Sequence, residues 1–307
     1  MFVHLPIANM DVSAAGLLLL GLVIGTLSGF FGVGGGFLLT PLLAAVFGIP
    51  MPVAVGSSLA QIAGTGVSGV IRHRGLGNVD YRLGTIVAGA AVLGLGPGVA
   101  LIDLLKRGGE VTVLGAPIPL ADLVVSLGYI PLLVGIALWM WSETRNATPG
   151  VDNTDGHHWA LARWARRLRL GPHVSLPASG VERISLWVPV VGGVGVGFLS
   201  AFLGVGGGFL FLPMLVYVLG VRTATAVATD LFQVVLVAGM GTVLHGLNGN
   251  IDAVLVIWVL VGGVIGAQVG ATFTRHASGP RIRRWFAYLT LIAAALVALR
   301  LAVKVRG

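Results

Sequence analysis

Six polar side chains recur at one spacing inside two apolar stretches of this 307-residue chain. They are Ser57, Ser58 and Gln61 in residues 51–72, and Thr229, Asp230 and Gln233 in residues 223–245. A spacing of three to four residues puts Ser57 or Ser58 on the same helical face as Gln61. It likewise puts Thr229 or Asp230 on the face of Gln233. Such groups inside apolar helices either face a cavity that binds a polar solute or hydrogen-bond to a neighbouring helix. The pattern predicts a substrate site at one depth in both stretches, with hydrogen bonding that holds helices together as the alternative.

Asp230 differs from the other five because it carries a carboxyl group into the middle of an apolar stretch. An ionised carboxylate there is costly unless it is protonated, hydrated or paired. Asp230 is therefore the candidate for coupling the movement of a solute to a proton. Its counterpart in the first stretch is Ser58, so this role would belong to one stretch only. A structural hydrogen bond made by a neutral acid is the alternative.

Two glycine runs of the form GVGGG each precede a short apolar segment. Their glycines are Gly32, Gly34, Gly35 and Gly36 in the first run, and Gly204, Gly206, Gly207 and Gly208 in the second. A helix that begins inside a membrane has free N–H groups and a positive dipole end, which suit an anion, and glycine lets the anion touch those amides. Close helix packing without a ligand is the alternative. Neither run has the Lys and Ser/Thr of a phosphate-binding loop, which disfavours nucleotide binding.

Two histidines and two aspartates flank a repeated GNxD turn. His73 and His245 precede the turn, and Asp80 and Asp252 close it. Aspartate directly before an apolar stretch is typical of a helix N-cap. We expect structural roles for all four residues, with gating or protonation by the histidines as the alternative.

The composition places these residues in a bilayer. Hydrophobic residues make up 56% of the chain, charged residues make up 10%, and the mean hydropathy is +0.97. An ordinary soluble domain has about 25% charged residues. The net charge of +8 comes from basic residues in short segments between apolar runs, which is typical of charges that orient membrane helices and not of a nucleic-acid surface. Because cysteine is absent, disulfides, thiol catalysis and cysteine metal sites are excluded. We also expect no metal and no cofactor.

Eight apolar segments are long enough to span a membrane. They cover residues 13–33, 51–72, 81–103, 120–141, 184–204, 223–245, 252–274 and 285–303. Two further segments, 36–47 and 208–219, hold about 12 residues each, or roughly 18 Å of helix against roughly 30 Å of hydrocarbon, so neither crosses alone as a straight helix. The first segment lacks a basic leader and follows Asp11, which indicates a retained helix and not a signal peptide.

The chain contains one unit twice. A shift of 172 residues places residues 30–41 (FFGVGGGFLLTP) on residues 202–213 (FLGVGGGFLFLP), with nine of twelve positions identical. The same shift aligns the polar stretches, the histidines and the GNxD turns. It also aligns four more glycines in each half, which are Gly21, Gly25, Gly94 and Gly98 with Gly193, Gly197, Gly266 and Gly270. This register indicates an internal duplication.

The basic residues predict that the two copies are inverted. If the region between the copies is cytoplasmic, an odd number of membrane entries per copy places both arginine-rich loops, around residues 72–82 and 275–284, in the cytoplasm. An even number would place the second of these loops outside. We therefore predict an all-α integral membrane protein with two inverted repeats of about five membrane-entering segments each, short glycine-broken helices, and both termini outside. The short segments either cross or form re-entrant hairpins.

The predicted organisation has three parts, which are a first membrane repeat at 1–141, a cytoplasmic linker at 142–182 and a second membrane repeat at 183–307. Within the linker, residues 158–170 place Leu161, Trp164, Ala165 and Leu168 on one helical face and arginines around the others. This pattern is typical of a short basic amphipathic helix that lies on an anionic membrane surface, and partner binding is the alternative.

The paired GFFGVGGGFLLTP and AFLGVGGGFLFLP motifs, each followed by a polar AVxxxLxQ stretch and a GNxD turn, resemble the TauE/SafE family of sulfite exporters and related permeases. The resemblance covers nearly the whole chain apart from the linker. It implies a permease of the bacterial inner membrane for sulfite, sulfonates or other small sulfur-containing anions. It leaves the direction of transport and the coupling ion open.

These patterns predict a secondary transporter that moves a small anion, with proton coupling as one option. The partners are then a small anionic substrate and the lipid bilayer, with no nucleic acid and no catalytic residue. A passive anion channel is the alternative. An intramembrane serine protease is disfavoured, because Ser68 of the sequence GVSG aligns with Met240 and so belongs to no shared site.

Overall fold

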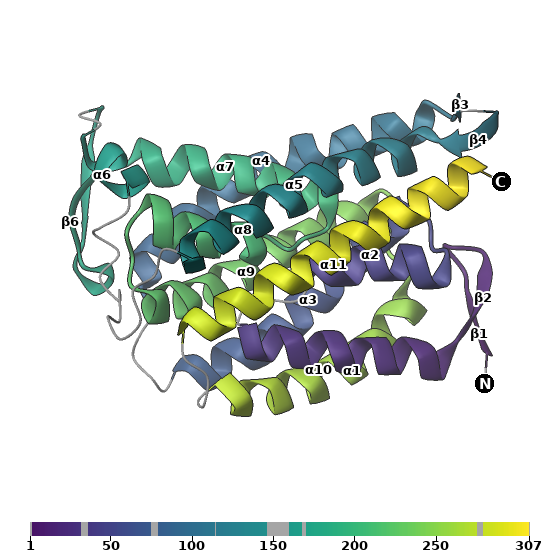
Figure 1. The fold of residues 1–307 in the computed structure, drawn as a ribbon, viewed down its shortest axis with the longest axis horizontal. Helices are drawn as coiled ribbons and strands as arrows, with labels where there is room; N and C mark the ends of the chain where they lie inside the picture. Colours follow the sequence, from purple (N-terminus) through teal and green to yellow (C-terminus); the bar gives the residue numbers. More distant parts are fainter. Residues whose placement is uncertain are drawn as a thin grey trace.

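The protein is a bundle of helices that run roughly side by side, as the computed structural model shows (Figure 1). The structure describes residues 2–31, 36–74, 79–113, 115–145, 160–167, 170–274 and 279–306. The helices of the first half are α1 (Ala14–Phe31), α2 (Gly36–Phe47), α3 (Met51–Arg74), α4 (Tyr81–Arg107) and α5 (Leu120–Arg145). Each lies within a few residues of a predicted segment.

The second half repeats this order. It contains α7 (Trp187–Leu203), α8 (Gly208–Pro213), the π-helical stretch η3 (Met214–Val218), α9 (Thr223–Leu247), α10 (Ala253–Thr274) and α11 (Gly279–Arg306). Helix α8 and η3 together fill the second predicted short segment. They follow each other without a break, with Pro213 at their junction. Proline lacks the N–H that a regular helix needs, which accounts for the change of helix type there.

Three small β-hairpins join the helical structure, and the sequence analysis did not predict them. They pair β1 (Phe2–Leu5) with β2 (Met10–Ser13), β3 (Glu110–Val113) with β4 (Ala116–Pro119), and β5 (His173–Leu176) with β6 (Val181–Ser185). The strands have four or five residues, too few for a clear alternating pattern. Glycines with positive φ, such as Gly115 and Gly180, turn the chain within two of the hairpins.

The linker contains the predicted short helix, with narrower bounds, as α6 (Ala160–Arg167). Arg163 and Arg167 are exposed, whereas Ala162 and Ala165 are buried. Helix α6 packs against β6 and η3, and Ala165 joins a buried cluster with residues of those elements. Ala165 belongs to the predicted apolar face, and at this position the face is therefore covered by protein and not by lipid. Leu168 lies outside the described residues.

The two ends of the bundle carry different elements. Both termini lie at one end, together with the hairpins β1–β2 and β3–β4 (Figure 1). Helix α6 and the hairpin β5–β6, which belong to the linker, lie at the opposite end. We call these the terminus end and the linker end.

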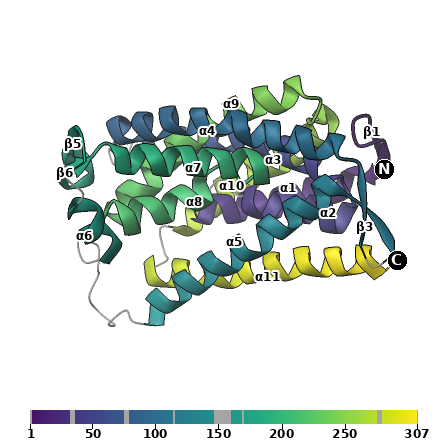
Figure 2. The same cartoon turned by 90° about the horizontal axis from the view of Figure 1, so that it is seen from above.

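Helices from opposite halves pair with one another. Helix α1 packs along α10, and its counterpart α7 packs along α4, while α3 and α9 pack together at the centre. Helices α5 and α11 lie side by side along one face (Figure 2). Each pair joins one helix of the first half to one of the second, so the halves are interlocked and not separate domains.

Glycines make two of these pairings possible. A Cβ at Gly197 of α7 would overlap the main chain of Ala91 in α4, and one at Gly25 of α1 would overlap the main chain of Gly263 in α10. The four matched pairs Gly21/Gly193, Gly25/Gly197, Gly94/Gly266 and Gly98/Gly270 all lie in these two interfaces. Small residues let helix backbones approach closely in this way.

The outer surface suits lipid. Within the described residues, five helices are long and apolar enough to cross a membrane, and four shorter apolar helices accompany them. Large apolar side chains such as Leu93, Val191, Ile257 and Ile292 are more than half exposed on these helices. These features support a multi-pass, helical membrane protein.

Candidate functional site

The six predicted polar residues lie at the centre of the bundle. Helices α3 and α9 carry them, and all six side chains are fully buried. They divide into two groups with different partners.

Ser57 and Thr229 join the two halves. The main-chain N–H of Asp252 donates to Ser57 Oγ at 3.1 Å, and the N–H of Asp80 donates to Thr229 Oγ1 at 3.0 Å. The 172-residue shift relates these two contacts to each other, because it places Ser57 on Thr229 and Asp80 on Asp252. Both hydroxyl groups therefore accept a hydrogen bond from the opposite half, as the structural alternative for these positions expects.

The two aspartates cap their helices as predicted. Asp80 Oδ1 accepts from the N–H of Leu83, and Asp252 Oδ1 accepts from the N–H groups of Val254 and Leu255. Their second oxygens accept hydrogen bonds from the linker and from the N-terminal hairpin. Asp80 Oδ2 accepts from Ser179 Oγ of the linker at 2.6 Å, and Asp252 Oδ2 accepts from the N–H of Ile7 in the N-terminal hairpin at 2.9 Å. The two matched aspartates thus stand at opposite ends of the bundle.

The other polar side chains are incompletely partnered. Within the described residues, no hydrogen-bond partner is found for Ser58 Oγ, either amide atom of Gln61, Asp230 Oδ2 or Gln233 Oε1. The remaining atoms of Asp230 and Gln233 do have a partner, because Gln233 Nε2 donates a hydrogen bond to Asp230 Oδ1 at 2.7 Å. A buried polar group without a partner costs about 1 to 3 kcal/mol, so a cluster of them suits a polar solute.

Ser200 of α7 belongs with this group, although the sequence analysis missed it. Its Oγ is buried and has no hydrogen-bond partner among the described residues. The signal was available in the repeat, because the 172-residue shift places Ser200 on Ser28, which is also buried.

The polar residues form two sets, one on each side of the crossing between α3 and α9. Leu59 of α3 lies against Gly241 of α9, while Gly66 lies against Val235, so the two helices run in opposite directions. At 1.5 Å per residue, Gln61 and Gln233 are then offset by about 9 Å along the bundle. The single depth expected from the sequence is not observed, because each set lies nearer the start of its own helix.

The described glycine run packs against the opposite half. Gly204, Gly206 and Gly207 have φ of 71°, 74° and 86°, a region that glycine adopts without strain. A Cβ on Gly204 would lie 2.7 Å from Val55 Cα, and one on Gly206 would lie 2.7 Å from Ile62 Cδ1. Residues 55, 58 and 62 share one face of α3. The second glycine run therefore adjoins the face of α3 that carries Ser58.

First-half side chains also hold the carbonyl groups at the end of α7. Tyr129 Oη donates to the carbonyl of Leu203 at 2.7 Å, and Thr40 Oγ1 donates to that of Gly204 at 3.1 Å. Of the first run, Gly36 begins α2, whereas Gly32, Gly34 and Gly35 lie outside the described residues.

The two short helices meet at their beginnings. The rings of Phe37 in α2 and Phe209 in α8 stack with their centroids 4.5 Å apart and their planes 16° apart. The 172-residue shift places these two residues on each other. The two short helices therefore begin next to each other, at matched positions of the two halves.

His245 has the structural role that was expected. Its Nε2 donates to the carbonyl of Ala201 at 2.9 Å, and its Nδ1 accepts from Asn250 Nδ2 at 3.3 Å. A ring nitrogen that bonds to a carbonyl must carry the proton, which fixes the tautomer. The side chain of His73 lies outside the described part of the chain. In that part, no group of three His, Asp or Glu side chains is placed to hold a metal ion.

Comparison with known protein families gives a match over most of the chain. The family described as "Sulfite exporter TauE/SafE" matches residues 17–297, which covers both halves and the linker. The chain belongs to the TauE/SafE family. The resemblance drawn from the paired glycine motifs is thus confirmed at the level of the family.

Curated relatives of this TauE/SafE protein are described as transporters. The chain is 27% identical over 263 residues to "Probable membrane transporter protein YdhB" of Bacillus subtilis, which covers 84% of this chain and 89% of the relative. A "Probable membrane transporter protein" of Xylella fastidiosa is 24% identical over 280 residues, which covers 90% of this chain and 91% of the relative. No solved structure matches the chain. The family and these relatives support a membrane transporter.

Proposed function

We propose that this TauE/SafE-family protein is a secondary transporter that moves a small anion, sulfite or an organosulfonate, across the bacterial inner membrane. The observation that carries the proposal is the set of buried, unpartnered polar groups on α3 and α9, at the centre of an apolar bundle. Serine hydroxyl and glutamine amide groups donate hydrogen bonds to the oxygens of such anions. The description of the family as sulfite exporters favours a sulfur oxyanion.

The proposal includes two inverted repeats that exchange equivalent conformations. Three observations support it, which are the opposite ends at which Asp80 and Asp252 stand, the opposite directions of α3 and α9, and the stacking of Phe37 on Phe209. In carriers of this kind the two halves rock around a central site, and each arrangement opens one side of the membrane. The matched hydrogen bonds of Ser57 and Thr229 connect the two halves, one toward each end of the bundle.

A carrier fits the centre of the bundle better than a passive channel does. Apolar side chains of Leu59, Ile62 and Val234 form a buried cluster between α3 and α9, next to the two polar sets. A channel needs a continuous hydrated path, whereas a carrier requires a barrier on one side of its substrate at all times. We therefore place the substrate at one polar set at a time.

Replacing Gln61 with leucine tests the site. Since neither amide atom of Gln61 has a partner in the described residues, leucine should leave the thermal stability unchanged or raise it. Anion flux should nevertheless fall about tenfold, the equivalent of one lost hydrogen bond to a charged group. The assay is uptake into liposomes, with a panel of sulfite, sulfate, thiosulfate, sulfoacetate and chloride.

The matched control is Gln268→Leu, the same change at an exposed position of α10. This variant should transport at the normal rate. Normal flux in Gln61→Leu would remove Gln61 from the site, and absence of flux for the whole panel in the unaltered protein would contradict the proposed substrate class. Conductance without saturation would identify a channel.

We further propose that the linker end is cytoplasmic and the terminus end external. The chain has no cysteine, so each introduced cysteine is unique. In intact cells an impermeant maleimide should label Glu110→Cys at the terminus end, and should label Arg163→Cys and Trp285→Cys only after lysis. All three native side chains are exposed. Labelling of Arg163→Cys and Trp285→Cys from opposite sides would contradict the inverted arrangement.

A further inference from the structure

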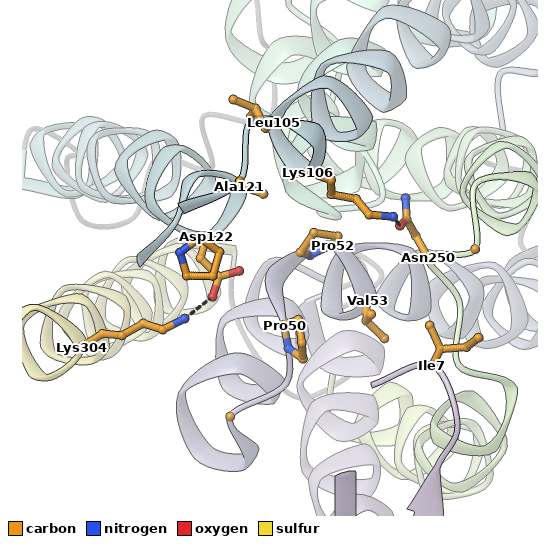
Figure 3. A pocket seen from close by; sticks show the side chains of 14 residues that line it. Ile7, Pro50, Pro52, Val53, Leu105, Lys106, Ala121, Asp122, Asn250 and Lys304 are labelled. Carbon is orange, nitrogen blue, oxygen red and sulfur yellow. Dashed lines mark hydrogen bonds and ion pairs between the residues drawn. The ribbon is translucent and has the colours of Figure 1, made fainter. Parts of the chain in front are cut away.

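A cavity of about 390 Å³ lies at the terminus end. Its wall comes from six parts of the chain, which are the N-terminal hairpin, the start of α3, the end of α4, the start of α5, the turn before α10 and the end of α11 (Figure 3). It lies within the size range of small-molecule sites. The sequence analysis did not predict it, because these segments are far apart in the sequence.

The cavity gathers both lysines of the protein. Of the 19 basic residues only Lys106 and Lys304 are lysines, and both line the cavity. Lys304 Nζ pairs with Asp122 Oδ2 at 2.6 Å, and Arg300 Nη2 reaches the same oxygen at 3.3 Å. The other oxygen of Asp122 accepts from the N–H of Met51 at the start of α3. The charged residues that line the cavity are thus two lysines and one aspartate, which leaves a net charge of +1.

Lys106 is the cation that carries no opposing charge. Its Nζ donates to Asn250 Oδ1 at 2.7 Å, and within the described residues it has no ion pair with a carboxylate. The amide of Asn250 is itself fixed, because its Nδ2 donates to His245 Nδ1. Figure 3 places Lys106 and Asn250 together on the cavity wall. The neighbouring Arg107 differs, since it pairs with Asp103 at 2.8 Å.

The cavity lies in line with the polar set of the first half. Val53 lines the cavity, and Ser57 and Ser58 follow it about one helical turn deeper along α3. The turn that supplies Gly249 and Asn250 also leads into Asp252, whose N–H donates to Ser57. An anion in the cavity would therefore stand one step outside the first polar set.

We infer that this cavity captures a small oxyanion, with Lys106 as its principal ligand, before the anion enters the transport site. The inference rests on the proposed function and names a second, peripheral site for the same substrate class. A compact ammonium group binds an oxyanion as a point charge, and a mouth with a net positive charge raises the local concentration of anions. Asn250 holds Lys106 in place without neutralising it, so the charge stays available.

Chemical labelling of the two lysines tests binding without any need for transport. In phosphate-free detergent, sulfate should slow acetylation of Lys106 about threefold relative to chloride at equal ionic strength. Screening by salt is the same in both solutions, so this difference would report sulfate bound in the cavity. Mass spectrometry reports each lysine separately. Equal protection by sulfate and chloride would overturn the inference. Protection that requires nanodiscs containing phosphatidylglycerol would assign the cavity to a lipid phosphate and would also overturn it.

Flux measurements test the role in capture. Lys106→Gln should raise the half-saturation concentration for the transported anion about threefold to tenfold at low ionic strength and leave the maximal rate unchanged, because the charge acts on entry. Arg107→Gln, which removes a charge from the next residue outside the cavity, should change neither. An unchanged half-saturation concentration in Lys106→Gln would overturn the role in capture. If no anion is transported at all, the proposed function fails, and the labelling result still decides whether the cavity binds an oxyanion.

Discussion

Replacing Asp230 with asparagine is expected to abolish the pH dependence of anion flux and to leave the protein folded. Asp230 is fully buried, and one of its oxygens has no hydrogen-bond partner among the described residues. Asparagine has nearly the same shape and keeps an oxygen that can accept from Gln233 Nε2. It cannot gain or lose a proton. If transport exchanges a proton at this position, the variant should carry its anion at a rate that no longer follows pH.

The measurement is anion flux into liposomes over a series of pH values, with and without a pH gradient. Asp103→Asn is the matched control, since it removes a carboxyl group that pairs with Arg107 near the end of α4. This control should keep the normal pH profile. An unchanged pH profile in Asp230→Asn would contradict the coupling role and leave the bond to Gln233 as the function of Asp230.

The repeat made most of the fold predictable. Every helix that the sequence analysis placed is present, because the apolar segments are long and the 172-residue shift matches the first four segments of one half to those of the other. The shift also identified glycines such as Gly25 and Gly197, although not what they do. Their contacts with α10 and α4 depend on how the halves interlock, and a sequence read one segment at a time does not contain that information.

The candidate site was predictable in part. The burial of Gln61 and Asp230 followed from polar residues that recur inside apolar stretches. The depth of the two sets did not, because a linear pattern gives a position along each helix but not the direction of the helix in the bundle. The cavity at the terminus end was not predictable either. Lys106 and Lys304 are almost 200 residues apart, and only the packing of the helices brings them to one cavity.

The interlocked helices lead to the prediction with the largest effect on stability, which compares Gly197→Ala with Gly195→Ala in α7. A Cβ at Gly197 would overlap the carbonyl group of Ala91, so α7 and α4 must move apart. Overpacking of this kind costs about 1 to 3 kcal/mol. A Cβ at Gly195 meets nothing within 4 Å. Alanine is favoured over glycine inside a helix by about 1 kcal/mol, so Gly195→Ala should be neutral or stabilising.

Thermal unfolding of both variants in detergent is the measurement. The unfolding temperature should fall for Gly197→Ala and stay the same or rise for Gly195→Ala, although the substitutions are identical and lie two residues apart. The contrast separates packing between the halves from helix propensity, which acts equally at both positions. A fall of similar size in both variants would mean that α7 does not lie against α4 as described. A lower unfolding temperature in Gly197→Ala alone would support close contact between α7 and α4 at Gly197. The repeat matches Gly197 to Gly25, which makes the corresponding contact at the α1–α10 interface.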